Sequence, residues 1–227
     1  RVDLGLRDQS GDGVDDNQIH RVGADEHFDD LERLLARVGL ADEELVDSVG
    51  NLQSQTGIWP DYPAPIIRHG ETGSWELTKA RWGMPTPPKF LDGKKTDKGV
   101  TNIRNVSSPH WRRWLGVEHR CLVPFTSFSE LDQRSGAPRN SPVWFAPGED
   151  RPLAFFAGLR TEWTPVRKLK EGETTTQLYG LLTCAPHADV RPVHPHSLPV
   201  RLTPLPRGAA DLLHHRARPR TRPAPCP

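Results

Sequence analysis

Residues 120–128 read RCLVPFTSF, a short apolar run that contains a proline. Runs of this length, rich in β-branched and aromatic residues, are typical of β-strands. Similar short apolar runs, interrupted by Pro and Gly, recur in GIWPDYPAPIIR (57–68), WELTKARWGM (75–84), PVWFA (142–146), LAFFAGL (153–159), QLYGLLTC (177–184) and LPVRLT (198–203). The sequence therefore predicts the strands of a mainly antiparallel β-sheet.

Two helices are predicted beside these strands. Apolar residues recur at helical spacing over residues 28–38, and SSPHWRRWLG (107–116) has Ser107 or Ser108 as a cap, Pro109 at the first helical position and a closing glycine. Strand runs with a few short helices indicate an α+β fold rather than a doubly wound sheet.

Composition limits the class of protein. The chain has 227 residues with 35% apolar content, which suits one domain with tails. No run reaches the 18 apolar residues that a membrane span needs, and the first thirty residues are too polar for a signal peptide. We expect a cytoplasmic monomer without a membrane partner.

Charge and proline content divide the chain. Residues 1–50 carry 14 Asp/Glu against 5 Lys/Arg, so the remaining residues carry 15 against 25. Residues 1–24 are predicted to form a flexible acidic leader, residues 25–203 a single domain, and residues 204–227 a disordered Pro/Arg-rich tail. A basic body suits a polyanionic partner, although such a charge excess serves solubility as often as nucleic-acid binding.

The stretch TNIRNVSSPHWRRWLGVEHR (101–120) mixes arginines with tryptophans. Arginine donates forked hydrogen bonds to phosphate, and Arg104 lies outside the predicted helix, which makes it the better phosphate ligand. Trp111 and Trp114 are spaced i and i+3 on the helix, so we interpret them as core anchors.

Two titratable residues are candidates for proton transfer. Glu130 ends the strand run VPFTSFSE, where apolar neighbours raise a carboxyl pKa and suit it to proton exchange. His194, in CAPHADVRPVHPHSLPV (184–200), supplies an imidazole partner. Together they suffice for acid–base chemistry on a carbonyl or an imine.

A metal site is an alternative use of the same segment. Cys184, His187, His194 and His196 form the pattern C-x2-H-x6-H-x-H, and an extended 194–196 would put both histidines on one face. The spacing matches no common zinc pattern, so we expect no metal and no cofactor, with a metal-dependent hydrolase kept as an alternative.

Four phrases together resemble one family: ARWGMPTPPKF (80–90), residues 101–130 from TNIR to FSE, RPLAFFAGL (151–159) and HPHSLPVRLT (194–203). In this order and spacing they are similar to the SOS-response-associated peptidase (SRAP) family, the abasic-site shielding proteins. The resemblance covers about residues 58–203. It implies a barrel-like fold with a few short helices.

The resemblance also implies a function, the covalent capture of abasic sites in single-stranded or junction DNA. In the family, the amine and thiol of an N-terminal cysteine condense with the sugar aldehyde to form a thiazolidine, and peptidase and lyase activities are associated with the same site. The resemblance assigns ring opening and proton shuttling to Glu130, the imine step to His194, and DNA binding to Asn102, Arg104 and Trp82.

The chain departs from the family pattern at its start. It begins at Arg1, nothing in residues 1–57 resembles a Met-Cys start, and the nitrogen of its first cysteine, Cys121, is an amide. We therefore expect no covalent crosslinking by the chain as written. A non-catalytic module that binds single-stranded DNA is the alternative from a different class.

Overall fold

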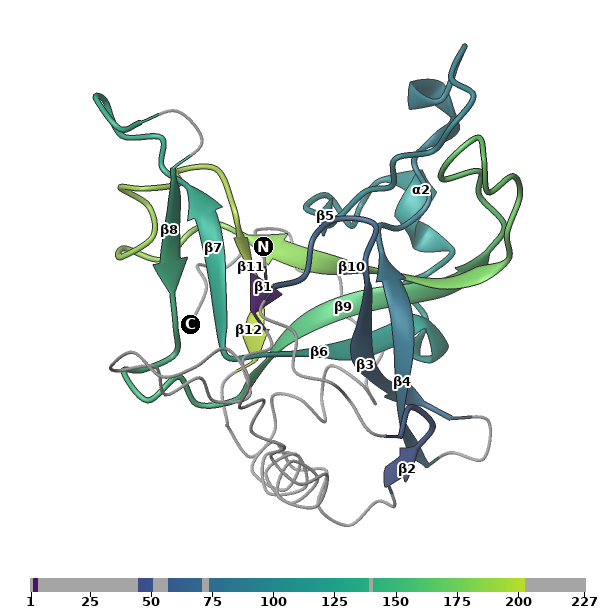
Figure 1. The fold of residues 1–227 in the computed structure, drawn as a ribbon, viewed down its shortest axis with the longest axis horizontal. Helices are drawn as coiled ribbons and strands as arrows, with labels where there is room; N and C mark the ends of the chain where they lie inside the picture. The colour runs from purple at the N-terminus through teal and green to yellow at the C-terminus, as the bar shows by residue number, and fades with distance from the viewer. Residues whose placement is uncertain (1, 4–44, 51–56, 71–73, 139–140, 203–227) are drawn as a thin grey trace, which may run out of the picture.

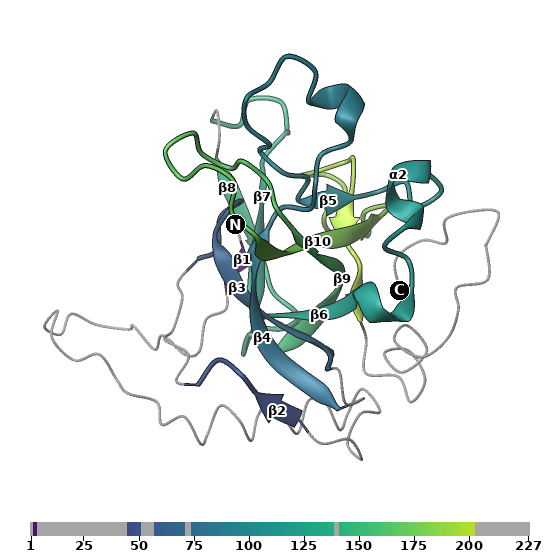
Figure 2. The same cartoon turned by 90° about the vertical axis from the view of Figure 1, so that its right-hand side faces the viewer.

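The computed structural model describes residues 2–3, 45–50, 57–70, 74–138 and 141–202. Within these ranges the apolar runs form strands, and five of them make up a barrel (Figures 1 and 2). The barrel strands are β3 (Pro63–His69), β4 (Trp75–Trp82), β6 (Arg120–Phe125), β9 (Ala154–Trp163) and β10 (Thr176–Cys184). The predicted α+β class with a barrel-like, mainly antiparallel sheet is confirmed.

The barrel is closed by one parallel pair. Strand β3 pairs antiparallel with β4 and β6, β6 pairs antiparallel with β9, and β9 pairs antiparallel with β10. Strand β10 then runs parallel to β4, with Leu178 opposite Arg81 and Tyr179 opposite Trp82. Every barrel strand thus has two neighbours, which removes the free edges of an open sheet.

Side chains that alternate along the barrel strands contribute to two different apolar clusters, one on each face of the sheet. Successive residues of a strand point to opposite faces, so Cys121, Val123 and Phe125 of β6 join the cluster that fills the barrel, while Leu122 packs in a second cluster. The ring of Phe125 stacks on that of Phe156, with centroids 3.6 Å apart. All six residues of β6 are buried for this reason.

Strands β6 and β9 approach closely around Gly158. A Cβ atom at this position would lie 2.8 Å from Cys121 Sγ and 3.1 Å from the Gly180 carbonyl oxygen, so only glycine fits. Burial also raises the pKa of the Cys121 thiol to about 12. Cys121 is therefore a core residue rather than a nucleophile.

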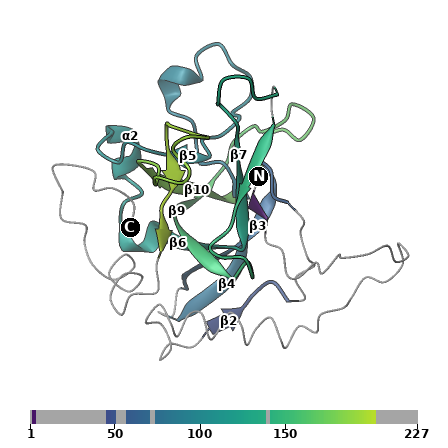
Figure 3. The same cartoon turned by 90° about the vertical axis from the view of Figure 1, so that its left-hand side faces the viewer.

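A smaller sheet stands beside the barrel and contains β1 (Val2–Asp3), β7 (Ser127–Leu131) and β8 (Pro142–Phe145) (Figures 1 and 3). The run 120–128 therefore belongs to two strands that separate at Thr126. Phe128 of β7 packs edge-on against Phe125 and Phe156, which attaches the small sheet to the barrel core.

The short elements differ in part from expectation. Helix α2 covers only Pro109–Arg112 after Ser108 and is shorter than predicted, because the chain turns to bury Trp111 and Trp114 as core anchors. Two 3-10 turns are η1 (Pro88–Phe90) and η2 (Val117–His119), and the remaining strands are β2 (Leu45–Asp47), β5 (Asn102–Ile103), β11 (Leu198–Pro199) and β12 (Arg201–Leu202).

Several predicted segments fall outside the described ranges. They are the helix over residues 28–38, most of the expected leader 1–24, and the tail 204–227. Val2 and Asp3, which were expected in the leader, form strand β1. Among the helices that the structure describes, none has the length and apolar character to cross a bilayer.

Candidate functional site

Glu130 and His194 lie in contact. Glu130 is on β7 and His194 is in the loop between β10 and β11, and the distance from Glu130 Oε2 to His194 Nδ1 is 3.5 Å. Their side chains are 19% and 17% exposed, so both are shielded yet reachable from solvent. The structure thus brings together the two residues predicted for proton transfer.

The surroundings of Glu130 suit a proton-exchanging carboxyl. Burial raises its pKa above the ordinary value, and the nearby positive charge of protonated His194 lowers it in part. Because Glu130 is two residues from Phe128 on the same strand, its side chain lies on the face of β7 that packs on the barrel. A carboxyl in this setting holds its proton to higher pH than an exposed one.

His194 is held by a turn of its own loop. The backbone N–H of His194 donates to the Val190 carbonyl at 2.8 Å, and both Val190 and Val193 are buried. The nitrogen Nδ1 also lies 3.0 Å from Nε2 of Gln133, a residue that sequence reasoning did not single out. No periodic or compositional signal marks Gln133, because its contact with His194 joins two loops that are distant in the sequence.

Asn102 lies in the short strand β5, and Arg104 directly follows this strand. Both are exposed, while Ile103 between them is buried, so the two side chains project to the same side. Within the described residues no carboxylate pairs with Arg104. Its guanidinium is therefore available to a phosphate.

Trp82 is buried and contacts the residue that precedes β5. Its ring is 6% exposed and lies parallel to that of Tyr179, with centroids 6.3 Å apart. The indole Nε1–H donates to the Thr101 carbonyl at 3.3 Å, next to Asn102. The structure thus places Trp82 in the barrel core, with a hydrogen bond to the residue that precedes Asn102.

Strand β10 connects the two halves of the site. Its residues Leu181 and Leu182 pair with β5, and Thr183 and Cys184 pair with β11, which closes the loop that holds His194. Strand β5, with Arg104 directly after it, and the His194 loop are therefore joined to the same end of β10.

Strand β1 brings the amino-terminal part of the chain to this site. It pairs antiparallel with β7, with Val2 opposite Phe128 and Asp3 opposite Ser127. Because the pairing is antiparallel, going from Asp3 to Val2 on β1 corresponds to going from Ser127 to Phe128 on β7, which is the direction of Ser129 and Glu130. The sequence offered no signal for this pairing, because two residues are too few to show alternation.

The metal alternative gains no support from geometry. Across the ranges that the structure describes, no three His, Cys, Asp or Glu side chains converge in a way that could hold a metal ion. His187 instead pairs with Asp189, 3.1 Å away, and His196 makes an edge contact with the ring of His194, with centroids 5.9 Å apart.

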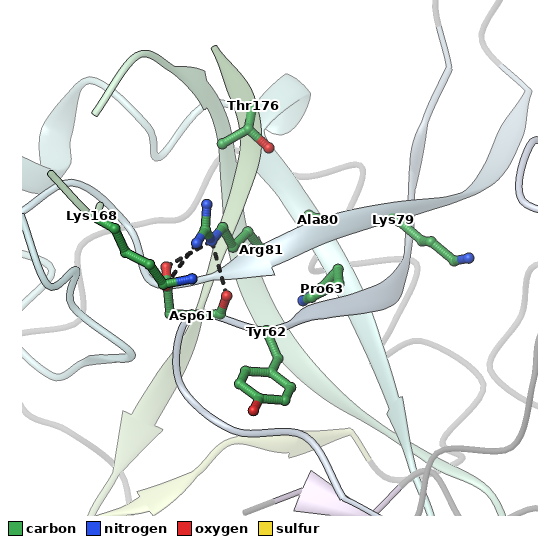
Figure 4. Close-up of a pocket in the computed structure, with 8 residues that line it drawn as sticks. All are labelled: Asp61, Tyr62, Pro63, Lys79, Ala80, Arg81, Lys168 and Thr176. Carbon is green, nitrogen blue, oxygen red and sulfur yellow. Dashed lines mark hydrogen bonds and ion pairs between the residues drawn. The ribbon is translucent and has the colours of Figure 1, made fainter. Parts of the chain in front are cut away.

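A basic pocket lies at the other end of β10 (Figure 4). Its volume is about 500 Å³. Asp61 accepts a hydrogen bond from Arg81 Nη2 at 2.7 Å, while Lys79 extends away from this pair. The lining residues are Asp61, Tyr62, Pro63, Lys79, Ala80, Arg81, Lys168 and Thr176. At about 3.3 Å per strand residue, Thr176 is well separated from the end of β10 near His194.

The chain is therefore a closed β-barrel protein with a carboxyl–imidazole pair, and an exposed asparagine and arginine lie at the end of β10 that is joined to the loop of this pair. Residues 23–222 match the family model described as SOS response associated peptidase (SRAP). The chain therefore belongs to the SRAP family, and its function is associated with the response to DNA damage. The resemblance inferred from the four sequence phrases is confirmed.

Solved structures share the fold. A protein from Bordetella bronchiseptica is 21% identical, with a TM-score of 0.50, over 84% of this chain and 90% of that chain. A phage-related protein from the same organism is 20% identical, with a TM-score of 0.50, over 76% of this chain and 74% of that chain. No curated protein sequence matches the chain significantly.

Proposed function

We propose that this protein processes abasic sites in single-stranded or junction DNA, with Glu130 and His194 as its acid–base pair. The observation that carries the proposal is the 3.5 Å contact between these side chains, in a chain that belongs to the SRAP family. Asn102 and Arg104 bind the DNA, since both are exposed at the same end of β10 as the His194 loop.

The chemistry needs a proton acceptor and a proton donor. Opening the sugar of an abasic site removes the proton of the anomeric hydroxyl and adds a proton to the ring oxygen, which leaves an aldehyde. An amine then condenses with the aldehyde and releases water. A partly buried carboxyl and a neighbouring imidazole perform such transfers, each worth about 10²–10⁴ in rate.

The nucleophile in the family is an N-terminal cysteine, and the position of β1 indicates where it would act. If the strand continued in the same register ahead of Val2, each earlier residue would lie one residue further along β7, from Phe128 toward Glu130. A cysteine placed within two residues ahead of Arg1 would therefore reach the stretch of β7 that contains Glu130. Its amine and thiol would lie beside the acid–base pair.

The test uses an abasic oligonucleotide and a denaturing gel. We expect the chain preceded by a cysteine with a free amine to form a stable adduct, and the sequence as printed to form none. We call the chain with this added amino-terminal cysteine the cysteine-led chain. In it, Glu130→Gln and His194→Ala are expected to slow adduct formation about 100-fold. A cysteine separated from Arg1 by about ten flexible residues is expected to react more slowly, because loop closure is then less favourable.

Matched controls are available on the surface. Glu149→Gln changes an exposed carboxyl, and His187→Ala changes an imidazole that is 51% exposed. Neither should alter the rate. Equal rates in Glu130→Gln, His194→Ala and these controls would contradict the proposed roles of the pair.

A non-catalytic DNA-binding module is the second candidate, and the exposed Arg104, which pairs with no carboxylate in the described part of the chain, favours it. This function predicts binding to abasic single strands that is unchanged by Glu130→Gln and His194→Ala. It also predicts that the cysteine-led chain forms no adduct. The gel and a binding titration together separate the two candidates.

A further inference from the structure

Nδ1 of His194 has two polar neighbours, and when Glu130 is ionised they require different protonation states of this nitrogen. Gln133 Nε2 lies 3.0 Å away, at hydrogen-bond distance, and Glu130 Oε2 lies 3.5 Å away. A ring nitrogen either carries a proton and donates or lacks one and accepts, so it satisfies only one of these partners. Which partner it satisfies decides where the imidazole proton lies.

The shorter contact favours Gln133. The side-chain nitrogen of glutamine is only a donor, so its hydrogen bond requires an Nδ1 without a proton. In a neutral imidazole the proton is then on Nε2. Glu130 at 3.5 Å is beyond the usual range of an N–H···O hydrogen bond.

The backbone holds Gln133 in place for this contact. Its N–H donates to the Val193 carbonyl at 2.9 Å, which joins the segment after β7 directly to the residue before His194. On one side of Gln133, the Asp132 N–H donates to the Ser141 carbonyl at 2.8 Å. Asp132 also pairs with Arg134 at 2.6 Å, so Gln133 lies in a turn that is fixed at both ends.

We infer that Gln133 is a positioning residue that holds neutral His194 in the tautomer with its proton on Nε2. The consequence for catalysis rests on the proposed function. His194 then acts as a proton donor through Nε2–H, and the Glu130 carboxylate is left as the acceptor. Without the Gln133 amide, Nδ1–H turns to Glu130, and the bare Nε2 can no longer donate.

The direct test is nitrogen NMR of the imidazole in the full chain. At a pH where His194 is neutral, we expect a protonated Nε2 and an unprotonated Nδ1 in the native protein. Gln133→Met removes the donor at similar length, and Gln133→Glu replaces it with an acceptor, so both should move the proton toward Nδ1. A native Nδ1–H tautomer, or unchanged nitrogen shifts in both variants, would overturn the inference.

A kinetic readout separates positioning from a structural role. In the cysteine-led chain, Gln133→Met is expected to slow adduct formation about tenfold while abasic DNA affinity changes less than about twofold. The dependence of this rate on pH should change as well. The other titratable and charged groups near His194 are Glu130, His196, the Asp132–Arg134 pair and the His187–Asp189 pair. Unchanged kinetics in both variants would contradict the role.

The two measurements keep this inference apart from the proposed function. Gln133 is exposed, so neither substitution disturbs the core, and melting curves check this. If the chain that begins at Arg1 and its cysteine-led form do not act on abasic DNA, the proposed function fails. The tautomer of His194 would still be decided by NMR alone.

Discussion

Arg167 and Asp97 are buried partners that hold the loop between Trp82 and Asn102. Arg167 Nη1 donates to the Asp97 carbonyl at 3.1 Å, and Nη2 donates to the Gly83 carbonyl. The Asp97 carboxylate accepts from the Gly99 N–H at 2.7 Å. The Arg167 guanidinium therefore contacts the loop both at its start, at Gly83, and near its end, at Asp97. This loop leads directly into β5, which carries Asn102.

Gly99→Ala is expected to loosen this anchor. Gly99 has φ of 78°, and a Cβ atom there would lie 2.9 Å from Gly83 Cα and against Arg167. Left-handed backbone costs about 1–2 kcal/mol for a residue with a side chain, and overpacking adds about 1–3 kcal/mol. Chemical denaturation should show the sum as a loss in the free energy of unfolding.

Gly93→Ala is the matched control. Gly93 lies in the same loop with φ of 69°, and a Cβ atom added there would have no heavy atom of the described chain within 4 Å. The substitution should therefore cost only the backbone part, about 1–2 kcal/mol. Equal losses in the two variants would show that Arg167 does not pack against Gly99 as described.

Glu130→Gln is expected to change how stability depends on pH. Burial raises the pKa of Glu130, so the fold favours the neutral carboxyl. This contribution is fully present below the ordinary value of about 4.5 and is lost as pH rises through the raised pKa in the folded state. Glutamine stays neutral, so the variant should gain stability relative to the native protein as pH increases across this window.

Melting temperatures between acidic and mildly alkaline pH check this sign. The difference between Glu130→Gln and the native protein should grow with pH and then stay constant. Glu149→Gln, at an exposed position, should show no such trend. A difference that stays constant throughout or falls as pH rises would contradict the assignment.

Arg104→Ala should weaken DNA binding in a salt-dependent manner. One lost phosphate contact reduces the slope of log K against log salt concentration by about 0.7 for a single strand. Lys170→Ala removes an exposed charge beyond the other end of β10 and should leave the slope unchanged. A titration at several salt concentrations measures both, and identical slopes in all three proteins would exclude a phosphate contact by Arg104.

Phe125→Ala should destabilise the barrel strongly. Its ring is fully buried and stacks on Phe156, and truncation of a buried phenylalanine costs about 3–5 kcal/mol. Phe90, which is 54% exposed, is the comparison, since surface substitutions usually change stability by less than about 0.5 kcal/mol. Denaturant midpoints should separate the two variants clearly, and a small loss in Phe125→Ala would argue against the described core.

Local patterns were enough to predict most of the barrel. The runs around Ala80, Leu122, Phe156 and Tyr179 became strands because apolar residues in short runs bounded by turns report burial directly. The predicted positions at which strands and helices end were less accurate. The run 120–128 divides at Thr126 and the helix after Ser108 is a single turn, since sheet changes and helix ends depend on contacts made elsewhere.

Strand positions, membership of the SRAP family, and Glu130 and His194 as candidates could all be read from the amino-acid sequence, because each is encoded by residues close together in the chain. Three features could be seen only in the folded chain: β10 closes the barrel on β4, β1 pairs with Ser127 and Phe128 of β7, and Gln133 contacts His194. Strand pairing and side-chain contacts depend on the register between distant segments. No local periodicity specifies that register.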